Sequence, residues 1–142
     1  MDNSKDIRWK QRFQNFDRAF VLLRSAFDDK KLDDFSELEQ EGIIQRFEFT
    51  FELAWKTLKD YLENSGIVFS PATPRNVIKE AFNLGILPDG QLWIDMMLHR
   101  NILSHNYDFS KFKIVLEAIA ARYLNAFEYL HEWFTERHLN ND

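Results

Sequence analysis

The sequence contains no cysteine, only four glycines and three prolines, and no long apolar run. Without cysteine, the chain can form neither a disulfide nor a cysteine-based zinc site. The few glycines are not clustered, which excludes a phosphate-cradling P-loop and a dinucleotide-binding fingerprint. No apolar run approaches the roughly 20 residues of a membrane span, so we expect a cytoplasmic protein without membrane contact.

An excess of positive charge is also missing, because 23 Asp and Glu outnumber 18 Lys and Arg and the net charge is −5. Such a chain has no global positive field that would attract nucleic acid, although a local basic patch is compatible with this balance. The length of 142 residues predicts a single domain over residues 1–142. Aromatic residues are abundant, with 14 Phe and 4 Trp, and most should fill the core.

Apolar residues recur every three or four positions through most of the chain, which is the pattern of amphipathic helices. This spacing predicts helices over about residues 6–29, 36–64, 73–85, 91–105 and 110–138. Ser36 and Glu39 fit a capping box at the start of the second helix, and Thr73 followed by Pro74 fits the start of the third. The sequence therefore predicts an all-α fold, an antiparallel up-and-down bundle of four main helices and one short helix.

The most informative motif is the segment Arg100-Asn101-Ile102-Leu103-Ser104-His105-Asn106-Tyr107 at the end of the fourth predicted helix. Arg100 occupies the next position on an apolar stripe, formed by Leu92, Trp93, Met96 and Met97. A charged residue is almost never fully buried without a partner, so Arg100 should either pair with a buried carboxylate or face a groove. A mismatch between pattern and residue type is where a functional site is expected.

Helical geometry limits how this motif can work. Arg100 and His105 are five positions apart, which on a continuous helix separates them by about 140° of rotation. The two side chains can therefore converge on one ligand only if the helix breaks near Ser104 or if two protomers contribute. Asn101 and His105, four positions apart, share one face.

A second candidate region lies on the second predicted helix, where Glu48, Glu52, Trp55 and Lys59 share one face. These side chains could line a polar groove in which the indole is a shelf for a base or a sugar. The structural alternative is an ordinary ion pair between Glu52 and Lys56, with Trp55 covering the edge of the core. In that alternative Glu48 or Glu52 could also be the buried, bidentate partner of Arg100.

The four histidines give no indication of a metal site, because none is paired with a second histidine at ligand spacing. Glu128 and His131 form one Glu-x-x-His pair, which no second helix repeats as a di-iron bundle requires. We therefore assign no metal to this chain. His131 and His138 lie among charged residues and are expected to be solvated.

Arg100-x4-His105-x-Tyr107, with Asn101 after the arginine, resembles the motif of HEPN domains (higher eukaryotes and prokaryotes nucleotide-binding). Together with the segment from Arg46 to Lys56, it looks like the nucleotidyltransferase substrate-binding protein family within that superfamily. The resemblance extends from the first predicted helix to the last.

The resemblance implies a dimerising helical bundle whose partner is a minimal nucleotidyltransferase encoded beside it. The partner would hold the nucleotide and a divalent metal, and this chain would contain no cofactor of its own. In the related toxin–antitoxin group the Arg and the His form a metal-independent ribonuclease site, and the partner adenylylates the Tyr. Arg100, His105 and Tyr107 occupy those positions here.

Three functions remain open from the sequence. The first is the substrate- or nucleotide-binding subunit of a two-component nucleotidyltransferase, with a site formed by the motif and the second helix: Arg100, Asn101, His105, Tyr107, Glu52 and Trp55. The second is a ribonuclease in which Arg100 and His105 are catalytic at a dimer interface and RNA is the substrate. The acidic balance of the chain argues against RNA as a default ligand. The third is an assembly module whose polar motif only fixes helix register.

Overall fold

The computed structural model describes residues 4–105 and 109–140, and within these ranges the chain is helical apart from its connections, with no strand. The elements are α1 (Ser4–Ser25), η1 (Leu32–Asp34), α2 (Glu37–Asn64), α3 (Pro74–Asn83), α4 (Gly90–His105), α5 (Phe109–Ala118), η2 (Ile119–Tyr123) and α6 (Leu124–Asn140). The predicted all-helical bundle is confirmed. Within the described ranges, no helix has the length and apolar character needed to cross a membrane.

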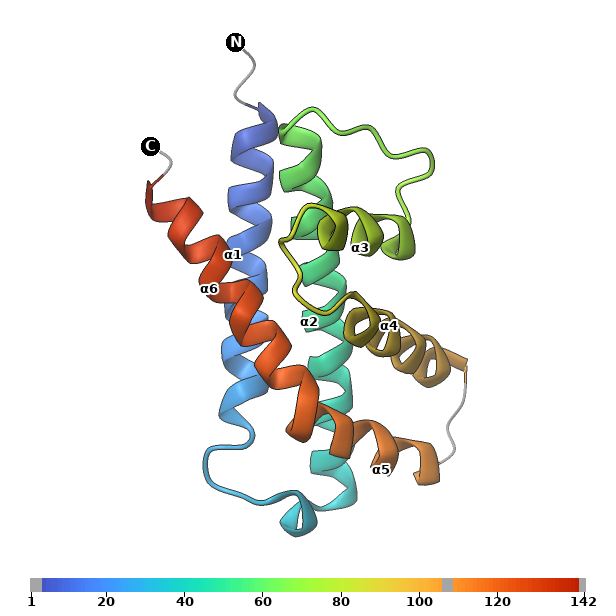
Figure 1. Cartoon of the computed structure of the whole chain (residues 1–142). Coiled ribbons are helices and arrows are strands. Elements are labelled where there is room, and N and C mark those ends of the chain that lie inside the picture. The colour runs from blue at the N-terminus through green and yellow to red at the C-terminus, as the bar shows by residue number, and fades with distance from the viewer. Residues whose placement is uncertain (1–3, 106–108, 141–142) are drawn as a thin grey trace.

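The two longest helices, α1 and α2, lie side by side and run in opposite directions (Figure 1). The predicted capping box starts α2: the Ser36 side chain accepts the Glu39 amide N–H at 3.1 Å, and the Glu39 carboxylate accepts the Ser36 amide at 3.0 Å. Two orphan amides at the helix end are thereby satisfied. The α1 and α2 pair forms the frame on which the other helices pack.

Two shorter helices, α3 and α4, pack against α2 and lie across its direction (Figure 1). The start of α3 is the predicted one, because Thr73 accepts the Asn76 amide at 3.2 Å and Pro74 occupies the first helical turn. Gly85 follows α3 with a φ of 80°, a conformation that glycine adopts without steric cost.

The last predicted helix is interrupted, which the sequence did not indicate. Between α5 and α6 the backbone forms the π-helical segment η2, and the chain changes direction in this region (Figure 1). α6 then crosses the α1 and α2 pair. A π-helical turn inserts one extra residue into an α-helix and occurs frequently at functional sites.

The core is dominated by aromatic rings, as the composition predicts. Trp9, Phe16, Phe47, Phe51 and Trp93 are at most 1% exposed. They come from α1, α2 and α4 and meet the buried face of α6 in one continuous cluster. This core holds α4 against α2 and so fixes where the motif residues lie.

Candidate functional site

The end of α4 places Arg100 beside α2. Trp93, Met96 and Met97 of the same helix are buried, and Arg100 is the next position of that stripe, at the point where the core gives way to the surface. Asp89 accepts the Leu92 amide at 3.1 Å and begins the helix. The stripe therefore anchors α4 and directs Arg100 towards the middle of α2.

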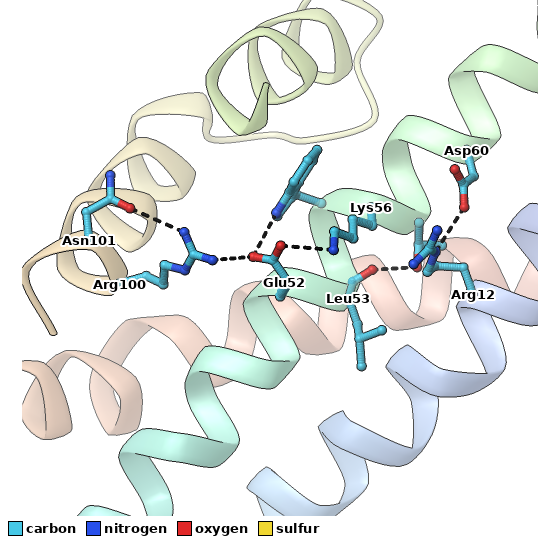
Figure 2. Close-up of polar contacts among 9 residues, drawn as sticks. Arg12, Glu52, Leu53, Lys56, Asp60, Arg100 and Asn101 are labelled. Carbon is cyan, nitrogen blue, oxygen red and sulfur yellow. Dashed lines mark hydrogen bonds and ion pairs between the residues drawn. The ribbon is translucent and has the colours of Figure 1, made fainter. Parts of the chain in front are cut away.

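Glu52 of α2 is the partner of Arg100. Arg100 Nη2 donates to Glu52 Oε2 at 2.6 Å, and Arg100 Nη1 is 3.5 Å from Asn101 Oδ1 (Figure 2). The predicted pairing of Arg100 with Glu52 is therefore present. The pair is part-buried and not enclosed, because the two side chains are 30% and 28% exposed. Solvent access explains how Arg100 can replace an apolar residue on the stripe.

Glu52 has two further partners on its own helix. Lys56 Nζ is 3.1 Å from Glu52 Oε1, and Trp55 Nε1 donates to Glu52 Oε2 at 3.2 Å. The alternative of a Glu52–Lys56 pair with Trp55 at the core edge is thus confirmed, since Trp55 is 8% exposed. The indole is not an open shelf. Its N–H orients the carboxylate that holds Arg100.

Glu48 lies one turn before Glu52 on the same side of α2 and is half-buried. Burial raises the pKa of its carboxyl above the ordinary value, while the positive charge of Arg100 acts in the opposite direction. Two carboxylates and one guanidinium therefore share this face, and burial favours the protonated form of Glu48.

The rest of the motif is only partly described. The backbone of α4 stays helical through His105, so no break occurs at Ser104, and Arg100 and His105 are about 140° apart around the helix. The side chain of His105 is outside the described part of the chain. Asn106 and Tyr107 also lie outside the described residues, so the role of Tyr107 as the modified residue stays a prediction.

A part-buried hydrogen bond beside the motif was not predicted from the sequence. Tyr123 Oη is 2.7 Å from His99 Nδ1, and Tyr123 is fully buried at the end of η2. Burial raises the pKa of the Tyr123 phenol to about 12 and lowers the pKa of His99 below its usual value. Both groups therefore favour the neutral form, and the histidine tautomer decides which of them donates the hydrogen bond. Only the position of His99 next to Arg100 could have drawn attention to it.

The Tyr123 bond is flanked by an ion pair between the same two parts of the fold. Arg122 Nη2 lies 2.8 Å from Asp95 Oδ2, and this hydrogen bond lowers the pKa of Asp95. Gln91 donates to the other carboxylate oxygen of Asp95 at 2.9 Å. Together these contacts fasten α4 to η2 on the side away from Glu52.

The expectation that His131 and His138 are solvated is wrong. His131 Nε2 lies 2.5 Å from Asp17 Oδ1 and its ring packs against Phe13 and Phe20 of α1, at 5.6 and 5.3 Å between centroids. His138 packs against Phe13 at 5.8 Å. Both histidines therefore form contacts between α1 and α6. The charged residues near them in the sequence led to the incorrect prediction. Among the described residues no group of three potential metal ligands occurs.

The most deeply buried charge is Asp60 of α2, whose side chain is fully enclosed. Arg12 Nε of α1 donates to Asp60 Oδ2 at 3.0 Å (Figure 2). Lys59 Nζ is 3.4 Å from Asp60 Oδ1. This pair was also missed. Its aspartate cannot reach a ligand without unfolding of its surroundings, so we interpret it as a structural link between α1 and α2.

Two solved structures are similar to this fold. HI0074 from Haemophilus influenzae, described as revealing the fold of a substrate binding domain of a nucleotidyltransferase, has a TM-score of 0.73 and 28% identity. A protein from Thermus thermophilus has a TM-score of 0.68 and 31% identity. Each match covers 87% of this chain and 98% of the other.

Among curated proteins, the "Probable ribonuclease HepT" of Haemophilus influenzae is 34% identical over 73 residues, or 49% of this chain. The chain spans about half the length of this curated relative. A family model described as "Nucleotidyltransferase substrate binding protein like" matches residues 11–136. That match includes α2, α4 and the whole Arg100 motif, so the chain belongs to the nucleotidyltransferase substrate-binding protein family.

Proposed function

We propose that this chain is the substrate- or nucleotide-binding subunit of a two-component nucleotidyltransferase and acts with a separately encoded minimal transferase. The observation that carries the proposal is the Arg100–Glu52 pair. A guanidinium held at 2.6 Å by one carboxylate, with 30% of its side chain exposed, is oriented and still accessible to a ligand. Membership of a nucleotidyltransferase substrate-binding family supports a transferase as the partner.

Arg100 would bind a phosphate, because the planar guanidinium matches phosphate oxygens. Glu52, held by Trp55 and Lys56, would keep the guanidinium in position. The expected roles of Asn101 and His105 are hydrogen bonds to the ligand. Nucleotide and divalent metal would be held by the partner subunit, and this chain would need no cofactor of its own.

Tyr107 would be the acceptor of a nucleotidyl group. Its phenolic oxygen would form the bond to the α-phosphorus of ATP, pyrophosphate would leave and the phenol proton would pass to water. Such a modification would suit a toxin–antitoxin pair in which the transferase silences this chain.

A homodimer is part of the proposal. Because α4 continues to His105, one copy separates Arg100 and His105 by about 140° around the helix. The remaining way to bring both types of side chain to one ligand is a second copy. A twofold dimer is the commonest arrangement of this kind.

The test uses the purified chain, the minimal transferase encoded beside it, Mg²⁺ and ATP labelled on the α-phosphate. We expect transfer of label to this chain, abolished by Tyr107→Phe and strongly reduced by Arg100→Ala. Tyr129→Phe is the matched control, because Tyr129 is an exposed tyrosine on α6. Labelling that persists in Tyr107→Phe would exclude Tyr107 as the acceptor, and failure of the wild-type chain to bind the transferase would disprove the proposal.

A second function, a metal-independent ribonuclease, is favoured by one observation: the curated relative is described as a probable ribonuclease. His105 would then take the proton of a ribose 2′-hydroxyl, and Arg100 would stabilise the negative charge on the phosphorane. The net charge of −5 counts against this function.

Incubating the chain alone with RNA in the presence of EDTA separates the two functions. RNA cleavage that is lost in His105→Ala and retained in His138→Ala would support the ribonuclease. Absence of cleavage, combined with labelling by the transferase, would leave the binding-subunit function.

A further inference from the structure

A groove runs along the outside of the α1 and α2 pair and has a volume of about 350 Å³. It is lined by residues of these two helices alone: Asn15, Arg18, Ala19, Leu22, Arg46, Phe49 and Leu53. The core-facing aromatic residues of α1, such as Phe16 and Phe20, are fully buried on other positions of the helix. The groove is therefore a surface that the fold itself does not use.

The groove exposes large apolar side chains. Phe49 is 58% exposed and Leu22 is 53% exposed, whereas the neighbouring Phe47 and Phe51 are fully buried. The exposed parts of Phe49 and Leu22 therefore contribute nothing to the core. Contiguous exposed apolar surface of this kind marks interaction sites, and buried aromatic anchors provide much of the energy of protein interfaces.

The charges at the groove define the occupant. Among the described residues Arg18 and Arg46 line it and no carboxylate does, although the chain as a whole has a net charge of −5. Arg46 Nη1 donates to the Leu22 carbonyl at 2.8 Å, which holds its guanidinium at the groove. Electrostatic complementarity then requires carboxylates on the occupant. A second copy seated groove to groove about a twofold axis would instead bring arginines together, which disfavours it.

The groove is adjacent to the Arg100 site. At about 100° per residue, Phe49 and Leu53 lie about a quarter turn around α2 from Glu48 and Glu52. Figure 2 shows Glu52 directed to Arg100, while Leu53 lies on the side of α1. A protein seated in the groove would need to extend only around α2 to reach Arg100.

We propose that this groove is the docking surface for the nucleotidyltransferase subunit, which inserts an apolar side chain against Phe49 and places carboxylates on Arg18 and Arg46. The inference rests on the proposed function. It adds the contact surface and predicts that the transferase presents its active site from this side of α2.

The experiment measures the affinity of the full chain for the transferase encoded beside it by isothermal titration calorimetry. Phe49→Asp and the double variant Arg18→Glu/Arg46→Glu should each weaken binding by about 30-fold or more, the effect of losing an interface anchor. Matched controls are Leu38→Asp, which changes another exposed apolar residue of α2, and Arg75→Glu on α3. Both controls should bind like the wild type.

The outcomes separate this inference from the proposed function. If the wild-type chain does not bind the transferase, the proposed function fails and the docking surface with it. If the wild type binds and both groove variants bind equally well, only the docking surface is disproved. Sedimentation of the same variants tests whether the groove binds a second copy of this chain, and RNA-binding assays test whether it binds RNA. Loss of a homodimer, or of RNA binding, with unchanged transferase affinity would overturn the inference.

Folding of the variants is checked by thermal melts. Phe49, Arg18 and Arg46 are all exposed, so the variants should melt close to the wild type. If Phe49→Asp fails to fold, the affinity of the double arginine variant for the transferase still tests the docking surface. In addition, the affinity of the wild type should fall with rising salt more steeply than that of the double variant.

Discussion

Arg100 of α4 and Glu52 of α2 form an ion pair of 2.6 Å in which both side chains remain nearly one-third exposed. A second pair on α2, between Arg12 and Asp60, has a longer distance of 3.0 Å but encloses its carboxylate completely. The contribution of an ion pair to stability depends on what remains after one partner is removed. These two pairs should therefore behave differently under the same substitution.

We expect Arg100→Ala to lower the free energy of unfolding by less than about 1 kcal/mol, as for exposed ion pairs. Glu52 would keep Lys56, Trp55 and solvent as partners. Thermal and urea unfolding measure the effect, with Arg24→Ala as the control because Arg24 forms the exposed pair with Glu128. A loss of several kcal/mol with unchanged ligand binding would make the motif a register lock and the chain an assembly module.

Arg12→Ala should cost more, about 3 kcal/mol, because it leaves the buried Asp60 carboxylate with Lys59 as its remaining cation. Urea unfolding of Arg12→Ala beside Arg100→Ala compares the two pairs directly. Adding Asp60→Asn to Arg12→Ala should restore part of the loss, since the stranded charge is then removed. Equal losses in the two arginine variants would contradict the structural role assigned to Asp60.

Phe51→Ala should destabilise the bundle by about 3–5 kcal/mol, because the ring is fully buried and its removal leaves a cavity. Phe49→Ala is the matched control, two positions away on the same helix and 58% exposed. It should change the free energy of unfolding by less than about 0.5 kcal/mol. Similar effects of both substitutions would mean that the faces of α2 are assigned incorrectly.

Tyr123→Phe should lower stability by about 1 kcal/mol, because His99 Nδ1 loses its hydrogen-bond partner in a part-buried site. The wild-type protein should also lose stability as the pH falls through the interval below 6.5. The pKa of His99 is lowered in the folded state, so the unfolded chain binds the proton first. Unfolding curves between pH 5 and 8 measure this, and His99→Asn should remove that part of the pH dependence.

Glu48→Gln should raise stability at neutral pH. Burial raises the pKa of Glu48 above 4.5, so the folded state binds the proton more tightly and stability is lost as the pH rises through the interval just above 4.5. The glutamine variant avoids this loss, and its advantage should disappear at lower pH. Glu41→Gln, an exposed position of the same helix, is the control. An unchanged or lower melting temperature of Glu48→Gln at pH 7 would contradict the effect of burial.

Local signals in the sequence predicted the helix starts correctly, because a capping box or a Thr-Pro pair needs only neighbouring residues. The partner of Arg100 could be narrowed to Glu48 or Glu52 but not decided, since both lie on one face of α2 and the choice depends on how α4 crosses it. Residues 48 positions apart, such as Arg12 and Asp60, give no local signal of their pairing.

The burial of His131 was concealed for a related reason. Charged residues lie near it along the chain, and only the packing of α6 on α1 shows that Asp17 and three phenylalanine rings lie beside it. Sequence periodicity indicates which face of a helix is apolar, but it does not indicate which polar residue at the edge of that face another helix will cover.

The π-helical segment η2 accommodates an extra residue between α5 and α6. Its π-helical turn takes up one residue more than an α-helical turn, so the apolar stripe of α6 keeps its register with the helix before it. Phe127 of that stripe packs on Phe16 and Phe20 of α1, and Phe134 packs on Trp9 and Phe13. Deleting one of the two alanines of η2 should therefore convert the segment into a regular helix and leave these contacts in place. The same deletion inside the regular helix between Tyr123 and Phe127 should instead turn the stripe by about 100° and separate the last helix from the first.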